Sequence, residues 1–291
     1  MNQILTIAKP SPPQPYPISS ATLTRFFLTL LAVILSWGLS LESAVAGTLS
    51  DRVAQFPHWQ TLPSLPAAQG DLTYPDWLAG NWTVTTTLVD LVAPLAPELT
   101  TPGFDSNRQY LNQPIVFQAR FIPAVSPQSR PPFLSLPIQR QTLPAALIAD
   151  RAFNGLNLAN AYLKADQAQT ESPILAVKVD PSNPNRQITF LRHDRQLVST
   201  VTARATETPA PNHFITTELF QQEFRGIAQP YFNRVETTTD YHQLASEAQP
   251  HQPAIVADQI TAIYLSPQDP HYFQAGDHPV ALYRYRLEFH R

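Results

Sequence analysis

The eight histidines are the first residues whose type could do chemistry, because a neutral imidazole binds metals and accepts protons near neutral pH. No two are four residues apart, the spacing that puts two imidazoles on one face of a zinc-binding helix, and the chain has no Cys to complete a zinc site. His213 and His242 fall in neighbouring predicted strands and could meet there, although two solvent-facing imidazoles are the simpler interpretation. We therefore expect no metal and no cofactor.

Motifs for catalysis are missing as well. The chain contains no G-x-S-x-G, no glycine-rich phosphate loop and no dinucleotide fingerprint, and its 8 Gly leave few places where a backbone could approach a phosphate closely. Pairs of acids such as Asp71 with Asp76, or Glu218 with Glu223, lack a spacing that predicts a glycosidase. We predict no catalytic residues, which favours a protein that is not an enzyme.

Aromatic and small residues at alternating positions suggest a lined interior instead. Tyr hydroxyls among apolar groups could orient a pigment, a lipid or a quinone-like molecule inside a β-barrel. A barrel of eight or nine strands is also narrow enough for side chains to fill it, so a packed core remains the alternative. The predicted lining consists of Trp82, Val84, Thr86, Tyr231, Tyr241, Tyr283 and Tyr285.

These residues need strands to position them, and the sequence is rich in strand signals. The clearest is the segment 231–242, in which Tyr231, Val235 and Tyr241 fall on one face and Glu236 and His242 on the other. One helix is predicted over 150–166, with Asp150 as its N-cap. Parallel units would need a helix between successive strands, so the pattern predicts a mainly β, antiparallel barrel of about 8–10 strands. The other predicted strands are 82–92, 115–122, 174–179, 186–191, 196–206, 213–224, 254–265 and 280–290.

The first 46 residues have the pattern of an export signal. Arg25 precedes an apolar run over 26–41, and Ala44-Val45-Ala46 is a small-residue cleavage signal, so we expect a signal peptide that is cleaved after Ala46. An uncleaved membrane anchor is the alternative. The predicted organisation is a leader and signal peptide over 1–46, an N-terminal arm over 47–73 and a β-barrel domain over 74–291. Export would place the domain outside the cytoplasm.

The charge pattern gives no reason to expect a nucleic-acid partner. The formal net charge is −3, charged residues make up 14% of the chain, and Lys and Arg are scattered. Binding to phosphate backbones needs clustered basic residues, so nucleic acid is excluded as a partner.

The pair Gly80-x-Trp82 at the start of the first long strand resembles the opening motif of the lipocalin and calycin families. That resemblance implies that Trp82 packs across the closed end of a barrel, against an Arg of the last strand. Arg284 and Arg286 are the candidates, each as a cation over the indole face. Gly80, Trp82, Arg284 and Arg286 therefore form the predicted barrel closure.

A longer resemblance covers most of the chain after residue 73. The stretches YPDWLAGNWTVTTTLVD, LNQPIVFQARFIP and DRAFNGLNLANAYL resemble an uncharacterised family of cyanobacteria and chloroplasts with members in or near the thylakoid lumen. The resemblance implies no activity. We expect an exported lipocalin-like protein of the thylakoid lumen or periplasm that binds a small apolar ligand without catalysis. The alternative is an interaction or assembly factor for a photosynthetic membrane complex in the thylakoid or inner membrane, with a filled barrel core.

Overall fold

The computed structural model describes residues 48–101, 103–124, 145–165, 172–227, 230–245 and 252–291. The predicted signal peptide lies outside the described residues. None of the helices in the described ranges is both long and apolar enough to cross a membrane.

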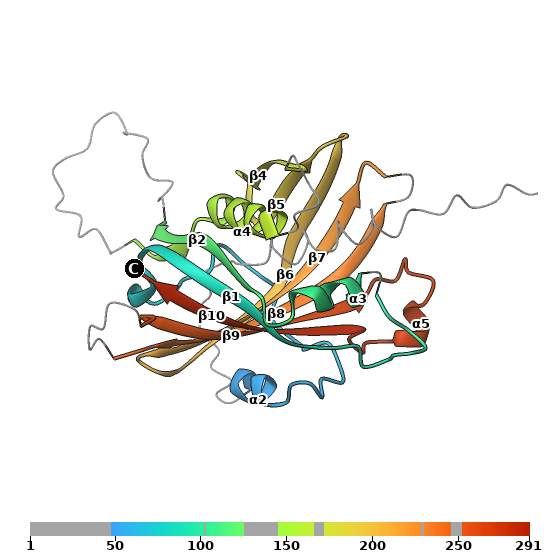
Figure 1. Cartoon of the computed structure of the whole chain (residues 1–291), viewed down its shortest axis with the longest axis horizontal. Coiled ribbons are helices and arrows are strands. Elements are labelled where there is room, and N and C mark those ends of the chain that lie inside the picture. Colours follow the sequence, from blue (N-terminus) through green and yellow to red (C-terminus); the bar gives the residue numbers. More distant parts are fainter. Residues whose placement is uncertain (1–47, 102, 125–144, 166–171, 228–229, 246–251) are drawn as a thin grey trace, which may run out of the picture.

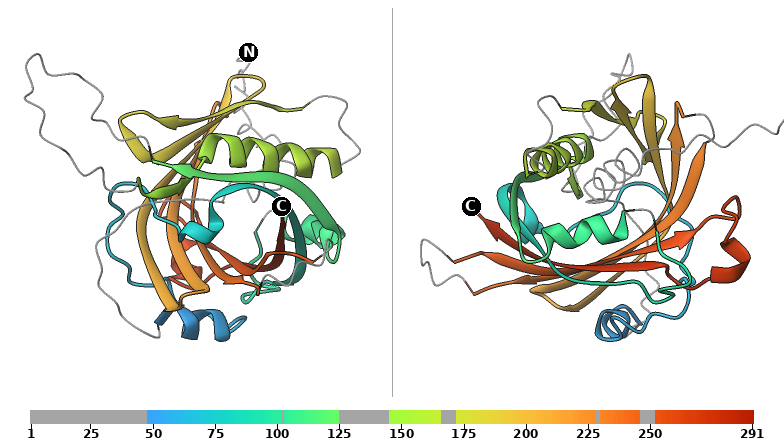
Figure 2. Two further views of the ribbon diagram at one scale, coloured as in Figure 1. Left: turned by 90° about the vertical axis from the view of Figure 1, so that its left-hand side faces the viewer. Right: turned by 45° about the vertical axis from the view of Figure 1, so that its right-hand side comes forward.

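Ten antiparallel strands form one sheet, in the order β3-β2-β1-β10-β9-β8-β7-β6-β5-β4. The sheet curls into a half-barrel (Figures 1 and 2), which confirms the predicted mainly β, antiparallel, barrel-like fold. Nine of the strands coincide with predicted segments. The strands are β1 (Gly80–Val92), β2 (Pro114–Pro123), β3 (Leu147–Ala149), β4 (Ile174–Asp180), β5 (Asn183–Leu191), β6 (Arg195–Ala210), β7 (His213–Arg225), β8 (Tyr231–Gln243), β9 (Ile255–Leu265) and β10 (Ala281–His290).

The longest helix of the described residues is α4 (Arg151–Ala165), which matches the predicted one. Its N-cap is confirmed, because the Asp150 carboxylate accepts a hydrogen bond from the Phe153 amide at 3.0 Å. The shorter helices are α2 (Thr48–Ala54), α3 (Phe104–Asn107) and α5 (Tyr272–Ala275), with 3-10 turns at Asp76–Leu78 and Arg108–Tyr110.

Helix α4 lies between the two ends of the sheet, next to β2 and β4 (Figure 2). On the β2 side, the Asn154 amide accepts from the Arg120 N–H at 2.8 Å and donates to the Arg120 carbonyl at 3.2 Å. The amide thus pairs backbone groups near the edge of the sheet. On the other side Gly155 approaches Gln187 and Val177, and a Cβ there would come within 3.2 Å of the Gln187 amide nitrogen. The helix therefore covers the gap that the strands leave.

Alternation along each strand divides the sheet into an inner and an outer face. On β1, Trp82, Val84 and Thr86 point inward and are buried, whereas Thr83 and Thr85 between them are partly exposed. The register shifts between Leu88 and Asp90, so the alternation is interrupted there. The inner face and α4 enclose the main apolar core.

The start of the N-terminal arm packs on the outer face of the sheet, where α2, at the bottom of Figure 1, contacts β6, β7 and β8. Trp59 is 2% exposed there and forms a second, smaller apolar core with Ile260, Tyr264 and Leu282. The arm therefore shields this part of the outer face from water, although the strands there also carry polar residues.

Candidate functional site

Trp82 lies at the start of β1 and is 1% exposed. Its indole N–H donates to the Leu78 carbonyl at 2.7 Å, and the Phe289 ring meets it edge to face at 6.1 Å between centroids. The cation over its ring is Arg291, with the guanidinium carbon 4.2 Å from the centroid. Gly80 has φ +106, and a Cβ there would come 3.2 Å from the Arg291 guanidinium. Gly80 and Trp82 therefore belong to this end of the half-barrel.

The prediction that Arg284 or Arg286 covers Trp82 is wrong. Both residues alternate with the inward Tyr283 and Tyr285 on β10, so their side chains leave on the outer face. Arg284 pairs there with Asp258, and Arg286 pairs with Glu288 at 2.9 Å. Arg291 directly follows β10 and has the parity of the inward Tyr283 and Tyr285, so its side chain lies on the side of the indole.

Six of the seven predicted lining residues point into the half-barrel and are buried. Tyr241 lies 6.3 Å from the Tyr74 ring and 6.1 Å from the Phe289 ring, and the Tyr283 hydroxyl accepts from the Asn107 amide at 3.1 Å. Burial raises the pKa of Tyr285, so its phenol stays neutral. The six are Trp82, Val84, Thr86, Tyr241, Tyr283 and Tyr285.

The seventh lining residue, Tyr231, is on the same face of β8 as Tyr241 but at the opposite end of the strand. It is partly exposed and packs against Phe224, with 5.7 Å between ring centroids. The structure therefore does not bring Tyr231 together with the other predicted lining residues.

The other half of the interior is polar and charged. Arg204 of β6 and Glu218 of β7 face each other across the ladder, each 2% exposed, and the Arg204 Nε donates to the Glu218 carboxylate at 2.9 Å. Arg204 also donates to the Asn185 side chain of β5 and to the Gly70 carbonyl. Arg151, at the first turn of α4, is 4% exposed and donates to a β5 carbonyl. Two buried cations thus meet one buried carboxylate.

Burial dominates the electrostatics of this cluster. Loss of hydration raises the pKa of Glu218 to about 8, while Arg204 and Arg151 oppose that rise. Burial also lowers the pKa of Arg151, against the attraction of Glu218. When Glu218 is protonated, the two guanidinium groups leave an excess of positive charge, which the nearby Asp71 carboxylate offsets in part. Such a site is suited to an anionic or strongly hydrogen-bonding group.

Nine buried polar atoms in the polar half of the inner face have no hydrogen-bond partner within the described part of the chain. They come from the four strands β5, β7, β8 and β9, and no sequence pattern had marked their side chains as a polar interior. The residues are Gln187, Thr189, Thr216, Glu218, Gln222, Asn233 (both amide atoms), Thr237 and Thr261.

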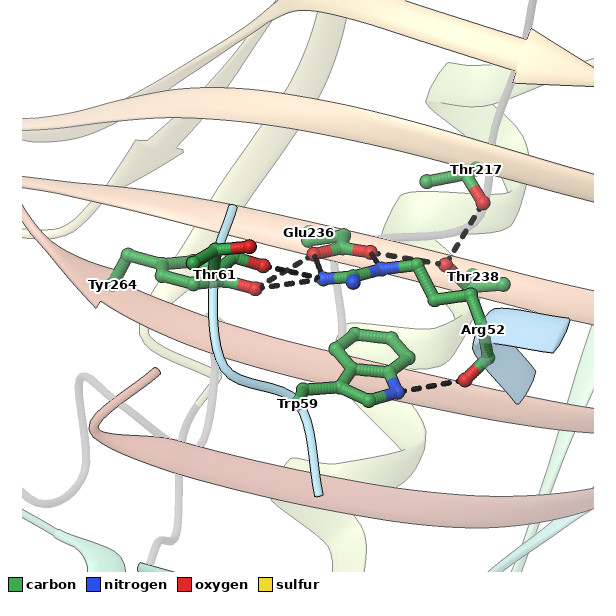
Figure 3. Close-up of polar contacts among 7 residues, drawn as sticks. All are labelled: Arg52, Trp59, Thr61, Thr217, Glu236, Thr238 and Tyr264. Carbon is green, nitrogen blue, oxygen red and sulfur yellow. Dashed lines mark hydrogen bonds and ion pairs between the residues drawn. The ribbon is translucent and has the colours of Figure 1, made fainter. Parts of the chain in front are cut away.

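A second buried carboxylate, Glu236, lies on the outer face beneath the N-terminal arm (Figure 3). Its side chain is 0% exposed and receives hydrogen bonds from Arg52 at 2.7 Å and from the Tyr264 hydroxyl at 2.8 Å. The Arg52 guanidinium also stacks 4.0 Å from the centre of the Trp59 ring, whose N–H donates to the Arg52 carbonyl. This cluster attaches the arm to the sheet.

His213 and His242 do meet, directly opposite each other on β7 and β8. Their rings stack on the outer wall with 4.0 Å between centroids, and both lie beside the Asp240 carboxylate. The sequence had suggested that the two histidines lie close together, but it had not indicated that the Asp240 carboxylate contacts both of them.

The fold and the interior together define a curled antiparallel β protein with one aromatic half and one polar, charged half. Residues 66–291 match the family described as a domain of unknown function, DUF6816, and the chain belongs to that family. No curated protein and no solved structure gives a significant match. The N-terminal arm up to residue 65, with Arg52 and Trp59, lies outside the matched segment.

Proposed function

We propose that the protein is an exported, non-catalytic binding protein whose half-barrel interior takes a small molecule with an apolar body and a polar or anionic head. The observation that carries the proposal is the set of nine unpartnered polar atoms on the inner face, next to Arg204 and Glu218. This narrows the expected pigment, lipid or quinone-like ligand to one with a hydrogen-bonding end.

The energetic argument concerns the cost of leaving those atoms unpaired. A buried donor or acceptor without a partner costs about 1–3 kcal/mol, and native interiors contain only a few. Several such atoms around Asn233 and Gln222, both 0% exposed, would lower the stability of the unliganded protein considerably. A bound molecule that supplies the missing donors and acceptors offsets this cost.

The aromatic half supplies the complementary surface. Tyr74, Phe121, Tyr241 and Phe289 form a connected set of rings, with centroids 4.8 Å apart for Tyr74 and Phe121. Rings in such contact favour a flat or aliphatic partner next to them. The proposed ligand therefore has its apolar part toward Trp82 and its polar part toward Arg204.

Gln221 and Gln222 offer a matched pair of variants, because neighbouring residues of β7 point to opposite faces. Wild-type protein, Gln222→Leu and Gln221→Leu are purified from the native host, and bound molecules are identified by native mass spectrometry and solvent extraction. We expect one co-purifying small molecule in the wild type and in Gln221→Leu, and its loss from a folded Gln222→Leu variant. The proposal would be contradicted if native mass spectrometry of the wild type gave only the mass of the polypeptide, with no bound molecule.

The second candidate is an interaction or assembly factor for a photosynthetic membrane complex. The packing of Trp82, Val84 and Tyr285, each at most 3% exposed, favours it, because a filled interior has no need of a ligand. Its test is affinity purification from membranes of the native host. Stable recovery of membrane subunits with protein that carries no small molecule supports this candidate over the first.

A further inference from the structure

We infer that His213, Asp240 and His242 form a binding site for a divalent transition-metal ion on the outer wall of the half-barrel. The one ligand atom offered by each residue lies within 4.8 Å of the others. The site uses the outward face of β7 and β8, so it is independent of the interior and of the function proposed for it.

The strand register brings the three side chains together. His213 is the Cα partner of His242 in the β7–β8 ladder, and Asp240 precedes His242 by two residues, which places it on the same face. Cross-strand partners on one face have Cβ atoms about 4.5–5.5 Å apart, a separation that two imidazoles can bridge through one ion. The ligands are therefore held by the backbone of two central strands rather than by loops.

The three donor atoms are already close together. The Asp240 Oδ1 lies 2.6 Å from the His213 Nε2 and 3.1 Å from the His242 Nε2. In a tetrahedral site with bonds of about 2.0–2.2 Å the donors are roughly 3.3–3.6 Å apart. Side-chain rotations that move the carboxylate less than about 1 Å from each imidazole nitrogen, and that tilt the two stacked rings toward a shared ion, would convert the hydrogen-bonded cluster into a metal site.

The donor set selects the kind of metal. Two imidazole nitrogens and one carboxylate oxygen suit Zn²⁺, Cu²⁺, Ni²⁺ or Fe²⁺, whereas Mg²⁺ and Ca²⁺ prefer oxygen ligands throughout. Three protein ligands leave at least one coordination position for water or an external group.

That position is reachable from outside. The side chains of His213, Asp240 and His242 are 21%, 15% and 43% exposed, respectively. A surface pocket of about 460 Å³ begins at His242 and extends between β8, β9, β10 and β1 to Asp90 and Arg284. An external ligand of the metal could occupy this pocket.

The test uses the purified protein, without an affinity tag, and ZnCl₂ and CuCl₂ as probes. Calorimetry should show one Zn²⁺ per chain, and electron paramagnetic resonance of the Cu²⁺ form should show hyperfine coupling from two imidazole nitrogens. His213→Ala and His242→Ala should each weaken Zn²⁺ binding by about 100-fold or more, since even the loss of an outer-shell partner costs 10–100-fold. MgCl₂ should give no heat above its dilution.

His58→Ala and His271→Ala are the controls, because both residues are exposed and lie outside the cluster. Zn²⁺ should raise the melting temperature of the wild type and of both controls, but not of His242→Ala, whose far-ultraviolet circular dichroism should be unchanged. Equal Zn²⁺ affinity in the cluster variants and the controls would overturn the assignment, and so would the absence of stoichiometric binding by the wild type.

Discussion

Trp82 shows how much one side chain can contribute to this fold. The indole is buried, hydrogen-bonded to Leu78 and enclosed by Phe289 and Arg291. Trp82→Ala should lower the free energy of unfolding by about 3–5 kcal/mol, as truncations of buried aromatic residues do. Urea denaturation measures this, with Val116→Ala, whose side chain is 55% exposed, as the control. A loss below about 1 kcal/mol would mean that Trp82 does not close this end of the half-barrel.

Glu218 should make stability depend on pH. The folded protein holds the Glu218 proton more tightly than the unfolded chain, because burial raises the pKa from its ordinary 4.5 to about 8. The unfolded state therefore binds fewer protons in this window, and the Glu218 contribution to stability falls as pH rises from about 5 to about 8.

The comparison of wild type with Glu218→Gln isolates this effect. The difference in unfolding free energy between the two proteins should shrink or reverse as pH rises from 5 to 8, measured by urea denaturation at several pH values. Glu223→Gln is the control, since the hydrogen bond from Arg225 lowers the Glu223 pKa and places its titration at more acidic pH. A difference that stays constant with pH would show that Glu218 is ionised throughout.

For single residues, the sequence predicted the strand face on which a side chain lies better than it predicted the residues that the side chain contacts. Period-two alternation correctly placed Tyr241 inside, but the arginine over Trp82 was sought only within the last predicted strand, and so Arg291 was missed. Alternation also does not tell which face of β7 is inside when both faces contain polar groups. Glu218 and Gln222 therefore did not stand out as interior residues.

The elements themselves were largely predictable because each has a local cause. Asp150 caps α4, and turn residues separate β4 from β5 and β6 from β7. The strand β3 was missed because its three residues are too few to show a period. The position of α4 across the two ends of the sheet depends on contacts between Asn154 and the backbone of Arg120, which no local pattern indicates.

The attachment of α2 to the sheet can be tested through its ion pair. Arg52→Met would leave Glu236 buried without a cation, and should cost about 3–5 kcal/mol of unfolding free energy. The double variant Arg52→Met with Glu236→Gln removes both charges and should recover a large part of that loss. Thermal and urea denaturation of the four proteins of this cycle give the coupling energy. A coupling near zero would show that the arm is held by Trp59 and its apolar neighbours alone.

For the whole molecule, the boundary of the family match raises a question about stability. The matched segment starts at residue 66, yet Trp59 and Arg52 cover part of the sheet from outside that segment. A chain that begins at residue 66 would expose Ile260 and Tyr264, and would leave Glu236 without its cation.

We therefore expect the chain over residues 66–291 to unfold at a much lower temperature than the chain over residues 48–291. Loss of the Trp59 packing and of the Arg52–Glu236 pair each cost about 3–5 kcal/mol, against a total stability of about 5–15 kcal/mol for a typical domain. Differential scanning calorimetry on the two chains measures the difference. A shorter chain that also carries Tyr264→Phe and Glu236→Gln should recover part of it, because those changes remove the polar groups that the arm had paired. If both unmodified chains melt at the same temperature, the sheet is stable with this outer face in water, and the arm serves some purpose other than stability.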